Sequence, residues 1–183
     1  MKQVFASWAV VYVGPVVASV TSGAFQLKMI GQWVFYGGFV MGIIVIPLII
    51  YRLVKIGEVL FSAKPSSTIL CAPTSLLLAG YMSSFLTPLS AFSLGMMCLS
   101  QLLYVIVMFN LPGWHRGGFR PSYSAFTFPL VITATSLKLV VTNPAFNLSG
   151  LMPLVLIEEA IATAAVFYVL VRYALHWIEV IKA

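Results

Sequence analysis

One long stretch without charge constrains this chain more than any other feature. Residues 65–114 contain no Asp, Glu, Lys or Arg. A soluble domain carries charge at about one position in four, so such a run cannot cover a surface that faces water. The whole chain is 61% hydrophobic and only 8% charged, which extends the same argument to all of it. We therefore expect the protein to fold in a lipid bilayer.

The apolar segments have the length of membrane-spanning helices. A helix needs about 20 mostly apolar residues to cross the hydrocarbon. The Thr87-Pro88 step divides the uncharged stretch into two such segments. We predict an all-α, multi-pass membrane protein with one transmembrane domain over residues 1–183. Its six predicted spans cover approximately residues 5–25, 33–51, 66–86, 89–109, 122–140 and 151–177.

The basic residues predict the orientation of these spans. Cytoplasmic loops of membrane proteins are enriched in Lys and Arg. In a six-span topology one side holds Lys2, Arg52, Lys55, Lys64, Arg116, Arg120, Arg172 and Lys182. The other side has Lys28, and Lys138 lies near the end of the fifth span. We expect a cell-membrane protein with both termini in the cytoplasm.

Enzyme, metal and nucleic-acid functions find no support in the sequence. The two cysteines, Cys71 and Cys98, lie inside apolar segments without metal-ligand spacing. His115 and His176 flank spans and do not converge within one. The net charge is +6, but the basic residues do not cluster with aromatic ones as nucleic-acid binding requires. We predict no catalytic activity, no metal, no cofactor and no nucleic-acid partner.

Three prolines recur at nearly equal spacing. Pro15, Pro73 and Pro129 fall in the first, third and fifth spans, 58 and 56 positions apart. A proline inside a helix frees a backbone carbonyl, which lipid tolerates only beside protein or a water-filled path. The odd spans are therefore interpreted as inner helices, kinked by proline around a central pore. Pro47 in the second span is an exception, and chance spacing of prolines remains the alternative.

Residues 121–130, PSYSAFTFPL, carry a more specific signal. They resemble an element of the tellurite-resistance/dicarboxylate transporter family, which includes the slow-type anion channels of plant guard cells. In that family WWAFTFP or WWSYTFP opens the ninth transmembrane helix; here Ser124 replaces the second Trp. Two further stretches resemble the family's seventh and fifth helices: Cys71-Ala72-Pro73-Thr74-Ser75 with Gly80-Tyr81, and Ser7-Trp8 through Val13-Gly14 to Ala18.

The resemblance implies an architecture and a gate. Family members have ten helices in five hairpins, with the odd helices lining a pore, and commonly assemble as trimers. The residue before the proline of the TFP element closes the pore, and here it is Phe128. The six spans correspond to helices five to ten, so this chain is expected to be the C-terminal part of a ten-helix transporter. A truncated reading frame, a fragment and a chain completed by a partner all remain open.

Several residues are candidates for an anion pathway. The pore and gate set comprises Phe128, Pro129, Thr127, Pro73, Thr74 and Pro15, with hydroxyls of Ser124, Ser75 and Ser19 as further donors. Each hydroxyl has the alternative of bonding to its own helix.

Three charged residues in the last two spans are also candidates. Lys138 is a possible anion site, or it extends to the membrane interface. Glu158 and Glu159 are possible proton sites, or they too are interfacial.

The sequence thus predicts transport of a small anion: a C4-dicarboxylate, tellurite or an inorganic anion. Its partners would be that anion, the bilayer and further copies of the chain. Two alternatives stay open, namely a six-helix carrier of unrelated fold and a membrane fragment or scaffold without transport activity.

Overall fold

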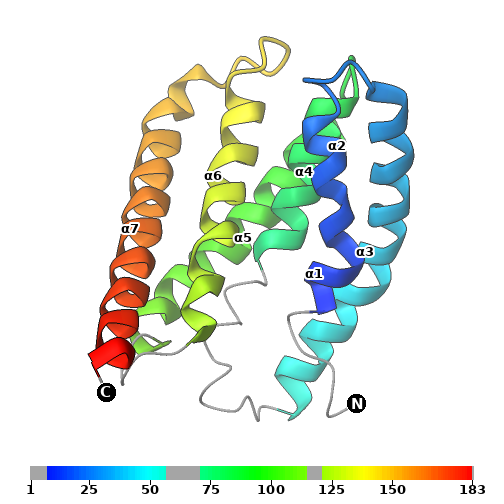
Figure 1. Cartoon of the computed structure of the whole chain (residues 1–183). Helices are drawn as coiled ribbons and strands as arrows, with labels where there is room; N and C mark the ends of the chain where they lie inside the picture. The colour runs from blue at the N-terminus through cyan, green and yellow to red at the C-terminus, as the bar shows by residue number, and fades with distance from the viewer. Residues whose placement is uncertain (1–7, 57–70, 115–120, 183) are drawn as a thin grey trace.

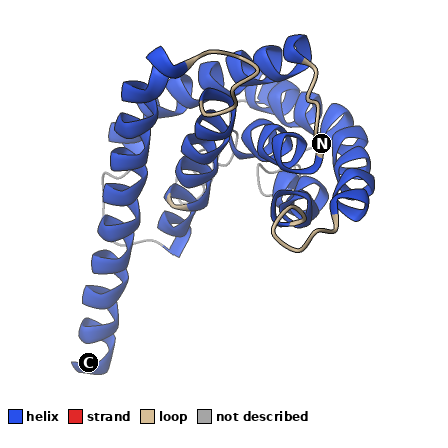
Figure 2. Ribbon diagram, turned by 90° about the horizontal axis from the view of Figure 1, so that it is seen from above, coloured by secondary structure: helices blue, strands red, loops and turns tan. Residues whose placement is uncertain are grey.

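All of the secondary structure in the described part of the chain is helical. The computed structural model describes residues 8–56, 71–114 and 121–182. Its ribbon contains helices and their connections but no strand within these ranges (Figures 1 and 2). The predicted all-α fold is confirmed. Lys2, Lys64, Arg116 and Arg120, which contribute to the predicted orientation, lie outside the described residues.

Each predicted span contains helix. The first comprises α1 (Trp8–Val13), the 3-10 turn η1 (Gly14–Val16) and α2 (Val17–Thr21). The next three are α3 (Lys28–Ile56), α4 (Ala72–Ser84) and α5 (Ser90–Trp114). The fifth joins the 3-10 helix η3 (Pro121–Phe126) to α6 (Phe128–Val141), and the sixth joins η4 (Ser149–Leu151) to α7 (Met152–Lys182).

Within the described residues, four segments are long and apolar enough to cross a membrane: Lys28–Tyr51, Ser90–Phe109, Tyr123–Val141 and Ser149–Lys182. The helical parts of the first predicted span (Trp8–Thr21) and α4 are shorter in this part of the chain. At a rise of 1.5 Å per residue, the 13 residues of α4 extend about 20 Å, against about 30 Å of hydrocarbon.

The three evenly spaced prolines lie at the start of a helix or in a 3-10 turn, and not in helix interiors. Pro73 and Pro129 stand at the second residue of α4 and α6, and Pro15 lies within the turn η1. The first amides of a helix have no intrahelical partner, so a proline there loses no hydrogen bond. The sequence analysis expected all three inside kinked helices. The structure instead has Pro73 and Pro129 in the first turn of a helix and Pro15 in a 3-10 turn, while Pro47 lies inside α3.

Helix α4 lies at the centre of the described helices. Every residue from Cys71 to Tyr81 is buried. The helix packs against α2 and α3 and also against α5 and α6, while α7 packs on α6 (Figure 1). The long helices expose large apolar side chains, such as Ile43 on α3 and Leu170 on α7. Water would penalise that surface, whereas acyl chains do not, which identifies a multi-pass membrane protein.

Glycines let the η1 turn fit closely between α3 and α4. A Cβ atom added to Gly38 would lie 2.0 Å from Val16 Cγ2, and one added to Gly80 would lie 2.7 Å from Val16 Cγ1. Both separations are shorter than real carbon contacts, so neither position has room for a side chain. Small residues at such contacts are the usual means by which membrane helices approach one another.

Two clusters of hydroxyl groups join the helices. Ser75 of α4 is hydrogen-bonded to Ser100 of α5 at 2.7 Å and to Thr133 of α6 at 2.9 Å. Near the other end of α4, Ser84 bonds Ser19 at 2.9 Å and Ser22 at 3.2 Å. Ser19 also donates to the Gly31 carbonyl at the start of α3. These contacts satisfy polar groups that lipid cannot.

We expect the Gly38→Ala variant to be less stable, by about 1–3 kcal/mol, because its methyl group overlaps Val16. Gly37 is a matched control on the same helix, since a Cβ there meets nothing within 4 Å. Gly37→Ala should be neutral or slightly stabilising. Thermal unfolding in detergent measures both. Equal unfolding temperatures of the two variants would contradict the close contact between η1 and α3.

We expect Ser75→Ala to lose about 1–2 kcal/mol of unfolding free energy, because it removes the shared partner of Ser100 and Thr133. Ser93 provides the comparison: its Oγ is buried and has no partner within the described residues. Ser93→Ala should therefore leave stability unchanged or raise it. The free energy of unfolding is measured in detergent for both variants. A loss for Ser93→Ala as large as that for Ser75→Ala would contradict the role given to the Ser75 hydroxyl.

Candidate functional site

Three of the predicted inner segments meet at one small pocket of about 30 Å³. Val10, Val13 and Gly14 line it from the first segment, Ala72, Pro73 and Leu76 from α4, and Phe128 from α6. Residues far apart in the sequence are thus brought together at the 3-10 turn of the first segment and at the starts of α4 and α6. Of the predicted gate set, this pocket unites Pro73 with Phe128, and it includes Gly14, the neighbour of Pro15.

Phe128 reaches this pocket because α6 begins with it. Thr127 takes the N-cap position between η3 and α6, and its hydroxyl donates to the Ser124 carbonyl at 2.7 Å. Pro129 follows as the second helical residue and is buried. The Phe128 side chain is 45% exposed, although its neighbours Pro129 and Leu130 are buried. The TFP sequence thus produces a change of helix type that leaves an aromatic ring partly uncovered.

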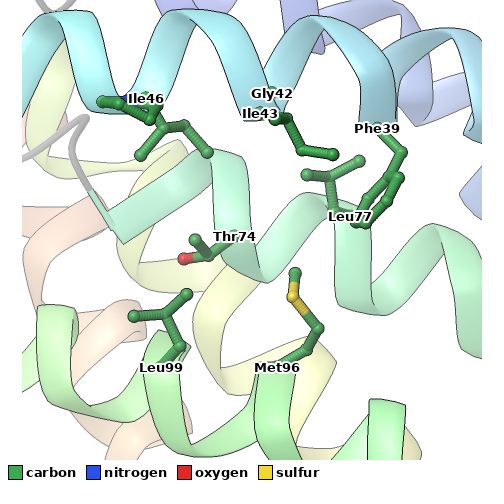
Figure 3. A pocket seen from close by; sticks show the side chains of 9 residues that line it. Phe39, Gly42, Ile43, Ile46, Thr74, Leu77, Met96 and Leu99 are labelled. Carbon is green, nitrogen blue, oxygen red and sulfur yellow. The ribbon is translucent and has the colours of Figure 1, made fainter.

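Thr74 lies on a different side of α4 from Pro73. It lines a second, apolar pocket of about 260 Å³ between α3, α4 and α5 (Figure 3). Its hydroxyl donates to the Cys71 carbonyl at 3.2 Å, which is a bond within its own helix. Thr74 is not among the residues that line the pocket beside Phe128. The structure does not bring Thr74 together with Phe128.

The remaining hydroxyl candidates divide into two groups. Ser19 and Ser75 are fully buried in the clusters that join the helices. Ser124 is exposed and Thr127 half-buried, on the same side of the α6 segment as Phe128. Pro15 is exposed at the surface of the η1 turn.

One face of the α6 segment is uncovered and carries polar groups. Its members recur every three or four residues, which places them on one side of the segment. They are Ser124, Thr127, Phe128, Val131, Thr135, Lys138 and Thr142, and all are exposed or half-buried. The residues between them are largely buried against α4, α5 and α7. Phe128 and Lys138 thus belong to a single face.

The two adjacent glutamates of α7 occupy different environments. Glu159 is paired with Lys138 of α6, with its Oε1 atom 2.8 Å from the Lys138 Nζ. Glu158 is 2% exposed, and the Gln101 Nε2 of α5 donates to its Oε2 at 3.5 Å. Glu158 therefore points between α7 and α5, away from the uncovered face of α6.

Two partners of these residues escaped the sequence analysis. Gln101 and Ser100 lie in the middle of an apolar helix, and they contact Glu158 and Ser75. Polar residues in the middle of a span are a usable signal, because lipid leaves them no other partner. Among the described residues no three His, Cys, Asp or Glu side chains are grouped so as to hold a metal.

Comparison with known proteins identifies the family. Residues 1–174 match the family described as voltage-dependent anion channel. No curated protein and no solved structure matches the chain significantly. The match covers nearly the whole chain, including the residues that line the pocket beside Phe128 and the uncovered face of α6. The chain belongs to the voltage-dependent anion channel family.

Proposed function

We propose that the protein conducts a small anion passively along the inner side of α1, α4 and α6, with Phe128 as the gate. Membership of the family indicates an anion channel or transporter. The observation that carries the specific proposal is the position of Phe128. Phe128 is 45% exposed, and it lines one pocket together with residues of the first segment and of α4.

An apolar ring at such a place suits a gate. A constriction lined by apolar groups excludes water and so blocks a hydrated ion. Phe128 faces Val10, Val13 and Leu76 across a pocket of only about 30 Å³, so its ring has little room to share with an ion. Rotation or removal of the ring would open space beside Pro73 and Gly14.

The charges and dipoles nearby favour anions. Lys138 supplies a cation on the same face of α6 as Phe128. Helix α6 begins at Phe128 and α4 at Ala72, both of which line the pocket. Helix N-termini carry a partial positive charge, which attracts anions. A C4-dicarboxylate, tellurite and an inorganic anion are the candidate substrates.

Passive flow is favoured over proton-coupled transport by the position of the carboxylates. A proton carrier must meet the path of the substrate. Glu158 is buried against Gln101 on the far side of the α6–α7 pair, and Glu159 is engaged by Lys138. Neither group offers an unengaged carboxylate on the face that carries Phe128.

The polar face of α6 also supports a larger assembly. Lipid would meet the Lys138 ammonium at a cost, which favours protein or water beside this face. We propose that further inner helices complete the pore and that the chain assembles with other copies, with both termini in the cytoplasm. The resemblance to ten-helix transporters that form trimers supports this arrangement.

We expect Phe128→Ala to raise anion flux severalfold, because it removes the ring that closes the path. Flux is measured with chloride-loaded proteoliposomes under a fixed membrane potential. Phe167→Ala is the matched control, since Phe167 is 64% exposed on the outer helix α7. It should leave flux unchanged.

The same experiment tests the alternatives. Absence of flux with chloride, malate and tellurite, both before and after the Phe128 change, would favour a scaffold without transport activity. Flux that responds equally to Phe128→Ala and Phe167→Ala would remove Phe128 from the pathway while keeping transport.

A further inference from the structure

The contact between Lys138 and Glu159 lies in an unusual place for an ion pair. The two side chains are 48% and 36% exposed, so they occupy the surface of the α6–α7 pair and not its core. Lys138 shares the uncovered face of α6 with Phe128, ten positions further along the helix. At 1.5 Å per residue this separation is about 15 Å, or half the hydrocarbon thickness.

The hydroxyl groups around Lys138 are occupied by the backbone. Thr135 donates to the Val131 carbonyl and Thr142 to the Lys138 carbonyl, each at 2.8 Å. On α7, Thr163 donates to the Glu159 carbonyl at 2.7 Å. An anion on this face therefore finds its strongest donor in the Lys138 ammonium, and that donor already holds a carboxylate.

The helix pair does not depend on this contact for its packing. Leu137 and Val141 of α6 form a buried cluster with Val155 of α7 at the same level of the hairpin. Close packing in this cluster stabilises the helix pair independently of the ion pair. If the ion pair only held α6 and α7 together, its location on the polar face would have no explanation.

We propose that Glu159 is a tethered competitor for anion binding at Lys138, and that it sets how tightly the pathway holds its substrate. This inference rests on the proposed function of the same face. An arriving anion displaces the Glu159 carboxylate from the Lys138 ammonium, and the carboxylate returns when the anion leaves. The exchange involves no covalent step and no proton transfer.

A competitor of this kind would keep anion binding weak enough for conduction. An ion must be attracted strongly enough to enter but released quickly enough to pass. A free lysine in a partly dehydrated path would retain anions, because the charge is poorly screened there. A carboxylate 2.8 Å away supplies a substitute partner and lowers the net gain of binding.

The test is the dependence of flux on chloride concentration in proteoliposomes. Glu159→Gln should lower the half-saturating chloride concentration by about two- to fivefold, because Lys138 loses its competitor. Lys138→Gln should raise that concentration, and the double variant should behave as Lys138→Gln does. Glu179→Gln removes the same charge near the far end of α7 and should change nothing. If Glu159→Gln does not fold, Glu159→Asp weakens the contact and should shift the value in the same direction.

Opposite shifts in the half-saturating chloride concentration of Glu159→Gln and Lys138→Gln would support the competitor. An ion pair that only held the two helices together would be lost in both variants, and both would change in the same direction. Parallel losses of flux and thermal stability, without opposite shifts in half-saturation, would overturn it. If Phe128→Ala raises flux while the Glu159 variants retain the original half-saturation, the inference fails and the proposed function stands. If no variant conducts chloride, including Phe128→Ala, both fail.

Discussion

Because α4 is buried, its polar side chains must find their hydrogen-bond partners on the neighbouring helices. From Cys71 to Tyr81 the helix has no exposed residue, and lipid surrounds the whole assembly, so its polar side chains must find partners in protein. Ser75 finds them in Ser100 of α5 and Thr133 of α6. Ser84 finds them in Ser19 and Ser22, beside the start of α3. These two clusters lie near opposite ends of α4. They determine which helices pack around it and the position of each along its axis.

Steric fit then determines where the pocket forms. Val16 contacts both Gly38 and Gly80, so the η1 turn is held between α3 and α4. Gly14 and Val13 directly precede it and consequently face Pro73 and Phe128. Because α6 is tied to α4 through Thr133, four residues after Pro129, the start of α6 is fixed at the same pocket. The position of Phe128 is thus a consequence of packing elsewhere in the bundle.

Local sequence signals predicted the helices, while side-chain directions depended on the tertiary structure. The proline spacing predicted only that the odd spans lie together as inner helices, and the structure brings Pro73 and Phe128 to one pocket. The spacing could not show that Thr74 faces α3 and α5, because that depends on the rotation of α4 among its neighbouring helices. Glu158 and Glu159 are adjacent in sequence, and only the orientation of α7 sends one to Gln101 and the other to Lys138.

The charges of the last two helices support a weakly binding path. Lys138 is accompanied by a carboxylate on the same surface, while Glu158 is enclosed beside a neutral amide. Glu159 compensates the charge of Lys138 on this surface, so the attraction for anions rests on a shared ammonium and on the helix N-termini. Divalent anions lose far more hydration free energy than monovalent ones on leaving water, since that energy grows with the square of the charge. A face with compensated charge cannot offset such a loss, so in the proposed function an anion keeps part of its hydration shell and the narrow space beside Phe128 limits its flow.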